Sequence, residues 1–388
     1  MGHYIGSKKS IVPLIDRLNK YPVGLVDNEK LREILALLFD EQEAFVASRF
    51  PLEEATVPEL VRCTKIAETE LLPLLERMAD KGLVMDIPYA GKTYYLLMPG
   101  LIGFFEFTFM KRRVDLPQAE LARLMSEYMY ENPKTGQASE FFGSKTSLTR
   151  ALVYEEQIPV SSEVTSYEDA RKIIENASFG AAGLCYCRHK KEHQDQSCAK
   201  GAPVENICIS LGSAAKFMAR RGFAEQKTKE ELLAILSTAR EHNLTHITDN
   251  IRQRPSFICN CCSCCCELML GVQSGYHEGV GKTPFLAQID QERCNGCGLC
   301  FTACNVKAID ALVGGGVEPV AQINTSACLG CGACVAVCKR KALTLVERPE
   351  RPLPPEKRKD MFKAILKEKG RMKPYVMSGV KKMLRKIF

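Results

Sequence analysis

Two stretches of twelve residues in the last third of the chain carry their cysteines at one shared spacing. "CNGCGLCFTACN" begins at residue 294 and "CLGCGACVAVCK" at residue 328, and both follow C-x2-C-x2-C-x3-C. Each stretch also holds two glycines, which let the backbone curl tightly and aim its amides inward. Thiols at such close spacing form a chelating set for soft metals, so this feature predicts two neighbouring metal centres.

The spacing resembles that of bacterial ferredoxins, which bind two [4Fe–4S] clusters. In that family the first three cysteines of a motif bind one cluster and the fourth binds the other. The resemblance implies a ferredoxin-like α+β domain over residues 282–347, with a short strand on each side of each loop. It also implies two ligand sets. The first is Cys294, Cys297, Cys300 and Cys338, and the second is Cys328, Cys331, Cys334 and Cys304.

The chain departs from the family at one point of each motif. Proline usually follows the fourth cysteine, whereas this chain has Asn305 and Lys339. Proline only shapes that turn, so we expect both [4Fe–4S] clusters to assemble. Two zinc sites with the same spacing are the alternative. Because neither cluster would have an open coordination site, this domain is expected to carry electrons.

A second cysteine-rich region lies between residues 185 and 266, and six of its thiols fall within "CNCCSCCC". Crowded thiolates repel each other unless a cation shares their charge, which favours metal binding. Ten thiols could bind two further cubanes with two left over, or one cubane with six left for another purpose. Zinc or another thiolate-bound metal and redox-active thiols are alternatives. The ten predicted ligands are Cys185, Cys187, Cys198, Cys208, Cys259, Cys261, Cys262, Cys264, Cys265 and Cys266.

The same region resembles a segment of iron–sulfur proteins from anaerobes. In those proteins a "CxCR…C…C…CNCCxCCC" pattern precedes a two-cluster ferredoxin domain, and the resemblance covers residues 180–347. It implies one or two additional iron–sulfur clusters but no defined activity. The spacing does not match the CCG modules of heterodisulfide-reductase-type proteins, which leaves a non-cubane catalytic cluster less favoured. Helical periodicity around the cysteines predicts a helical cysteine-rich domain over residues 111–281.

Residues 28–110 follow the order helix, helix–turn–helix, hairpin, which resembles a winged helix. We expect one amphipathic helix over residues 28–50 and a hairpin that turns at Ala90 and Gly91. The third helix is acidic and would repel phosphates, so DNA binding is disfavoured, and use of the fold for docking to protein or as a scaffold is favoured. Residues 1–27 form a separate N-terminal segment in this interpretation.

Residues 348–388 carry a net charge of +10, against −3 for the rest of the chain. This segment is predicted to be a proline-rich linker followed by a basic amphipathic helical tail. The tail could contact an anionic membrane surface, dock on an acidic partner or remain solvated. No signal peptide or membrane-spanning stretch is visible, so a cytoplasmic location is expected, with membrane association through the tail as an alternative.

Taken together, these features predict an α+β multidomain iron–sulfur protein that relays electrons in an anaerobic oxidoreductase system. Its expected partner is a redox protein, either a flavoprotein or a membrane oxidoreductase. A redox-sensing winged-helix regulator is one alternative. A reductase with an open-site cluster in the middle domain is another. No catalytic residue, electron donor or electron acceptor is evident from the sequence.

Overall fold

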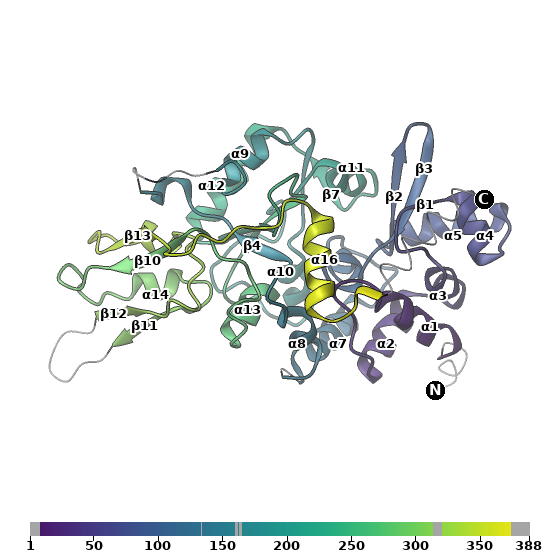
Figure 1. Cartoon of the computed structure of the whole chain (residues 1–388), viewed down its shortest axis with the longest axis horizontal. Coiled ribbons are helices and arrows are strands. Elements are labelled where there is room, and N and C mark those ends of the chain that lie inside the picture. Colours follow the sequence, from purple (N-terminus) through teal and green to yellow (C-terminus); the bar gives the residue numbers. More distant parts are fainter. Residues whose placement is uncertain (1–7, 133, 160–161, 163–164, 313–319, 374–388) are drawn as a thin grey trace.

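The computed structural model of the chain describes residues 8–132, 134–159, 162, 165–312 and 320–373. It is a mixed helix and sheet protein, as expected. The described residues within 285–347, called the ferredoxin-like part after the resemblance of their sequence, lie at one end. A large sheet with its helices occupies the middle, and the N-terminal helices and hairpin lie at the other end (Figure 1).

The N-terminal part contains helices followed by a small antiparallel sheet, in which β3 lies between β1 and β2. The hairpin turns at Ala90 and Gly91, both at positive φ, as expected. The single helix expected over residues 28–50 is wrong, because Asp40 and Glu43 form a capping box that starts a second helix. The elements are α1 (Lys8–Leu18), α2 (Glu29–Leu38), α3 (Glu41–Ser48), β1 (Ala55–Thr56), α4 (Val57–Thr64), α5 (Glu68–Asp80), β2 (Val84–Tyr89) and β3 (Lys92–Leu97).

One hydrophobic core joins the N-terminal part to the middle of the chain. It runs from Ile11 in α1 to Phe217 and Phe223. Arg221 adds ion pairs across the same contact, with Asp86 on β2 and with Glu76 on α5. The N-terminal part is therefore firmly packed against the middle. The connecting elements are η1 (Gly100–Phe104), α6 (Phe105–Phe109), α7 (Gln118–Tyr130) and α8 (Gln137–Phe142).

Among the described residues, the middle of the chain contains six strands in one antiparallel sheet, ordered β4-β8-β9-β6-β5-β7. The prediction of a helical domain over residues 111–281 is therefore wrong. The strands are three to five residues long, and β5 and β8 are buried at every position. Strands covered on both faces lack the alternation by which strands are recognised. They are β4 (Thr149–Ala151), β5 (Gly180–Gly183), β6 (Cys208–Leu211), β7 (Ala224–Gln226), β8 (Thr245–Asp249) and β9 (Phe257–Cys261).

Helices cover both faces of this sheet. Apolar side chains of α9 and α12 pack against Ile209 and Ile258 on one face. On the other face, α10 and α13 pack beside the cysteines. The helices of this part are η2 (Glu155–Gln157), α9 (Ala170–Glu175), α10 (Tyr186–Glu192), α11 (Gly212–Arg220), α12 (Lys229–Glu241) and α13 (Glu267–Gln273).

The ferredoxin-like part repeats a strand, loop, short helix and strand. Its outer strands β10 and β13 pair with each other, and its inner strands β11 and β12 form a second antiparallel pair. The strands expected on each side of the two cysteine loops are confirmed. The elements are β10 (Phe285–Ile289), α14 (Leu299–Ala303), β11 (Ile309–Leu312), β12 (Val320–Ile323), α15 (Ala333–Ala336) and β13 (Leu343–Glu347).

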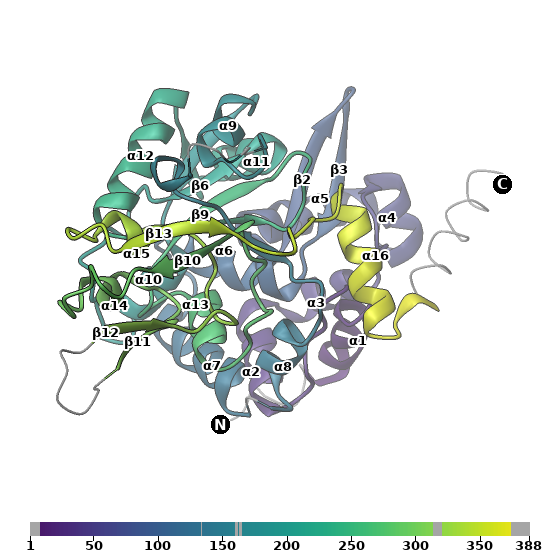
Figure 2. The same ribbon diagram turned by 60° about the vertical axis from the view of Figure 1, so that its left-hand side comes forward.

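The proline-rich segment and the first part of the basic tail run across the body from β13 to α8 (Figures 1 and 2). Helix α16 (Arg358–Glu368) buries Met361 and Ile365 against Ile251. Arg371 then pairs with Glu140 on α8. The tail is helical in this stretch, as predicted, but the apolar face of α16 is covered by the protein itself and not by a membrane, a partner or solvent.

The remainder of the predicted tail, residues 374–388, lies outside the described residues, as do residues 1–7 of the expected N-terminal segment. Across the part of the chain that the structure describes, no helix has the length and apolar character needed to cross a bilayer.

We predict that Ile365→Ala releases α16. The side chain is 1% exposed, and deleting such a group costs about 2–5 kcal/mol. Amide hydrogen exchange in α16 should speed up at least about 30-fold, because a loss of 2 kcal/mol raises the open population by that factor. Lys363→Ala removes an exposed side chain of the same helix and is the control. Equal exchange in the two variants would show that this packing does not hold the tail.

Candidate metal centres

All nineteen cysteines of the chain are free thiols. Cys63 lies apart on α4. The other eighteen gather in the middle and ferredoxin-like parts, and their neighbours divide them into four groups. Group I is Cys294, Cys297, Cys300 and Cys338, and group II is Cys304, Cys328, Cys331 and Cys334. Group III is Cys198, Cys262, Cys264 and Cys265, and group IV is Cys185, Cys187, Cys208, Cys259, Cys261 and Cys266.

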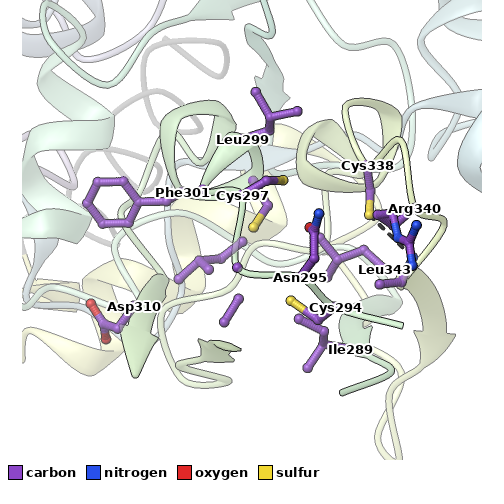
Figure 3. Close-up of a pocket in the computed structure, with 16 residues that line it drawn as sticks. Ile289, Cys294, Asn295, Cys297, Leu299, Phe301, Asp310, Cys338, Arg340 and Leu343 are labelled. Carbon is purple, nitrogen blue, oxygen red and sulfur yellow. Dashed lines mark hydrogen bonds between the residues drawn. The ribbon is translucent and has the colours of Figure 1, made fainter. Parts of the chain in front are cut away.

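The four thiols of group I line one cavity near the surface of the ferredoxin-like part. Figure 3 shows Cys294, Cys297 and Cys338 around this hollow. Gly296 and Gly298 have φ of 66° and 76°, which bends the loop around it as the glycine pattern predicted. The amide of Ala342 donates to the Cys338 sulfur at 3.3 Å. This combination of thiols, curled loop and amide donor fits a cubane.

Group II lies deeper, between group I and the sheet. Cys328 and Cys334 are buried, and burial raises the pKa of Cys304 to about 11. Burial also raises the pKa of Cys334, so Cys304 and Cys334 ionise only when a cation compensates their charge. The amide of Ala308 donates to the Cys304 sulfur at 3.2 Å, and Thr245 of β8 donates to the Cys331 sulfur at 3.6 Å.

The loop of group II is tightly confined. Gly330 has φ of 72°, and a Cβ there would lie 2.0 Å from the carbonyl oxygen of Phe285. No other residue type fits this position without moving the backbone, so the glycine is required for the fold of the loop.

Group III joins two distant loops. Cys198 follows α10, and the other three thiols lie in the turn between β9 and α13. The Cys264 sulfur is 3.7 Å from Cys198 and from Cys262, and 3.5 Å from Cys265. Contacts with the three neighbouring thiols favour the thiolate of Cys198 and hold its pKa well below the usual range. Within the described ranges, this is the one set of three or more cysteine, histidine or acidic ligand atoms that all lie within 4.8 Å of one another.

Group IV forms at one end of the six-stranded sheet. The antiparallel register of β6 and β9 places Cys208 beside Cys259, with 3.7 Å between their sulfurs. Cys261 follows two residues later, so it lies on the same face of β9. Cys187 and Cys266 contact each other from the starts of α10 and α13. Burial raises the pKa of Cys187 well above its ordinary value, so this thiol needs a cation to ionise.

Two cations, the buried Arg188 and the half-buried Lys200, connect the groups. Arg188 donates to the carbonyl oxygens of Pro203 and Asn260, and its charge acts on Cys185 of group IV and on Cys262 of group III. Although burial opposes its charge, these thiolates raise the pKa of Arg188 above the usual value. Lys200 has the same role between group III and group II. Burial lowers its pKa, and thiolates of both groups oppose that effect.

Neither cation was identified from the sequence. In the sequence, Arg188 and its neighbour Lys190 look like solvated charges. In the fold both side chains are buried, at 1% and 2% exposed. Lys190 pairs with Glu267. Each of the two connecting cations lies close to a cysteine in the sequence, since Arg188 directly follows Cys187 and Lys200 lies two residues after Cys198. This proximity is the sequence signal that could have identified them.

A titratable carboxyl also lies near group IV. Burial raises the pKa of Glu106 to about 7, and the Gly103 amide donates to its carboxylate at 2.7 Å. The neighbouring Ile102 has φ of 50°, a strained conformation for a β-branched residue. The charge of Glu106 acts on Cys208 and on Tyr186. This carboxyl was not identified from the sequence, because its burial arises only from the tertiary packing.

The comparisons with known proteins agree with the ferredoxin-like motifs. Residues 287–345 match the family model of the 4Fe-4S dicluster domain. This match spans both cysteine repeats and supports an iron–sulfur domain of the ferredoxin type. Searches of curated proteins and of solved structures found no match for the chain.

We predict that Glu106→Gln changes the pH dependence of stability. The carboxyl has a pKa of about 7 in the fold and 4.5 as its ordinary value. Below pH 4.5 it is protonated in both states and has no effect. As the pH rises from 4.5 to above 7, the free energy of unfolding falls by about 3 kcal/mol. Each difference of 1 between the folded and unfolded pKa corresponds to about 1.4 kcal/mol.

The urea midpoint should therefore fall between pH 5 and pH 8.5 in the wild-type protein and fall much less in Glu106→Gln. Glu120→Gln alters an exposed carboxyl and is the control. An unchanged pH profile in Glu106→Gln would contradict this role of burial.

Proposed function

We propose that this protein is an electron carrier of an oxidoreductase system. One observation carries the proposal: groups I, II, III and IV form a row from the exposed thiol of Cys297 to group IV, three of whose thiols are buried. [4Fe–4S] clusters bound in groups I, II and IV of this row would supply one-electron steps. The residues of the chain hold the row together, compensate its charge and present one end to a partner.

Groups I and II are the proposed ligand sets of the two ferredoxin-type clusters. The cavity supports the first set, because all four of its thiols line that one hollow. The electrostatic neighbours support the second, since the charges of Cys331, Cys304 and Cys328 act on Cys334 and raise its pKa further. The charge of Cys300 of group I also acts on Cys334, so the two sets adjoin. The six thiols of group IV are the proposed ligands of one additional cluster.

A chain of hydrogen bonds links the turn of group III to group II. The Gln273 side chain donates to the carbonyl oxygens of Ser263 and Asn305, at 2.8 and 2.9 Å. The Asn305 side chain donates to Thr245, and Thr245 donates to the Cys331 sulfur. Asn305 and Thr245 are 2% and 1% exposed. The two groups are therefore connected through ordered polar contacts that exclude solvent.

Group I is the proposed docking point for a redox partner. Cys297 is exposed, and the neighbouring Leu299 and Phe301 are 40% and 50% exposed. Three consecutive exposed cations, residues 339–341, follow Cys338. An apolar centre with a basic rim suits an acidic redox protein, such as a flavoprotein or an oxidoreductase subunit.

The N-terminal part is proposed to be a winged-helix-like scaffold that supports the middle of the chain. Its order of helix, strand, two helices and hairpin is that of a winged helix. The helix that would read DNA is α5, and its Glu76 and Asp80 pair with Arg221 of the same chain. This use of the acidic face favours a scaffold over a DNA-binding regulator.

Electron transfer to an acidic flavoprotein tests the function. The full chain, reduced by dithionite without oxygen, should reduce flavodoxin in stopped-flow mixing. The double variant Lys339→Glu and Arg340→Glu should slow the second-order rate at low salt by about tenfold or more, because it removes the attraction that steers encounter. Lys363→Glu on α16 is the control for a remote charge change. A wild-type protein that transfers no electrons would contradict the function, and equal rates in all variants would contradict the docking face.

A further inference from the structure

We propose that group III binds a single divalent metal ion in a tetrahedral thiolate site, and not a cubane. The candidates with this chemistry are Zn²⁺ and Fe²⁺, since soft thiolate ligands favour these ions. The proposal rests on the spacing of the four sulfurs, on the charges beside them and on the loops that supply them. It is independent of the proposed electron transfer.

The spacing of the sulfurs matches one ion at their centre. A metal–sulfur bond of about 2.3 Å in a tetrahedron places the sulfurs about 3.8 Å apart. The three sulfur–sulfur distances from Cys264 are 3.5, 3.7 and 3.7 Å, and all four sulfurs lie within 4.8 Å of one another. In a cubane each thiolate binds a different iron, so the sulfurs are held further apart.

The charges around group III also suit a divalent ion bound by four thiolates. Four thiolates around a divalent cation leave a net charge of −2. Arg188 acts on Cys198 and Cys262, and Lys200 acts on Cys262 and Cys264. The buried Arg188 and the half-buried Lys200 balance the charge of the site, which makes its partial burial energetically acceptable. The Ala199 amide also donates to the Cys264 sulfur at 3.3 Å, as expected of an outer contact that orients a metal ligand.

The site is closed and joins separate parts of the chain. Its four ligand atoms are all thiols, so no position is left for a substrate. Cys198 and Cys264 are 66 residues apart in the chain, and one shared ion would hold their loops together. Because the site lies between groups II and IV, zinc would make it a structural clamp, whereas iron would make it a relay that carries one electron.

The metal content of variants tests the proposal. Full-length protein should be purified without oxygen, and its iron, zinc and acid-labile sulfide measured per chain. Cys198→Ala combined with Cys264→Ala should remove about one metal ion and leave the sulfide unchanged. Loss of about four irons together with about four sulfides would show a cubane and overturn the proposal. Loss of no metal would overturn it as well. Cys63→Ala, outside the four groups, is the control.

The wild-type protein provides a second test that needs no substitution. X-ray absorption at the zinc edge should show four sulfurs at about 2.3 Å and no neighbouring metal. If the ion is iron, Mössbauer spectra should instead contain a mononuclear tetrathiolate component of one iron per chain. A protein with neither signal would contradict the proposal. These outcomes do not depend on whether the chain transfers electrons to a partner.

Discussion

The structure depends on the compensation of buried thiolate charge. Eighteen thiols gather beside one another, and burial raises the pKa of several, including Cys187 and Cys304. Such groups ionise only beside cations. Two protein cations, Arg188 and Lys200, lie between the groups. They balance only part of the charge, so bound metal is the natural source of the remainder.

The surrounding architecture serves this arrangement. The six-stranded sheet brings Cys208 beside Cys259, and the helices on one face carry Cys187 and Cys266 to the same end. The ferredoxin-like part then places group II against the sheet through Thr245 and Asn305. The N-terminal part and α16 pack around this assembly. The four groups are consequently held in fixed relation by ordinary packing and hydrogen bonds.

The sequence predicted the local features and missed those that depend on tertiary contacts. The ferredoxin-like strands and the hairpin at Gly91 follow from short-range patterns, and the structure has them. The middle sheet could not be recognised, because β5 and β8 are short and fully buried. The partition of the ten middle cysteines was also out of reach, since Cys198 meets Cys264 only after the intervening sheet has folded.

The most direct test of the account is the iron and acid-labile sulfide content of the wild-type protein, purified without oxygen. Clusters in groups I, II and IV and one ion in group III predict about 12 sulfides per chain, with about 12 or 13 irons depending on whether that ion is zinc or iron. Fewer than about 8 irons and 8 sulfides would contradict the account, because the ferredoxin-type groups themselves would then lack their two clusters.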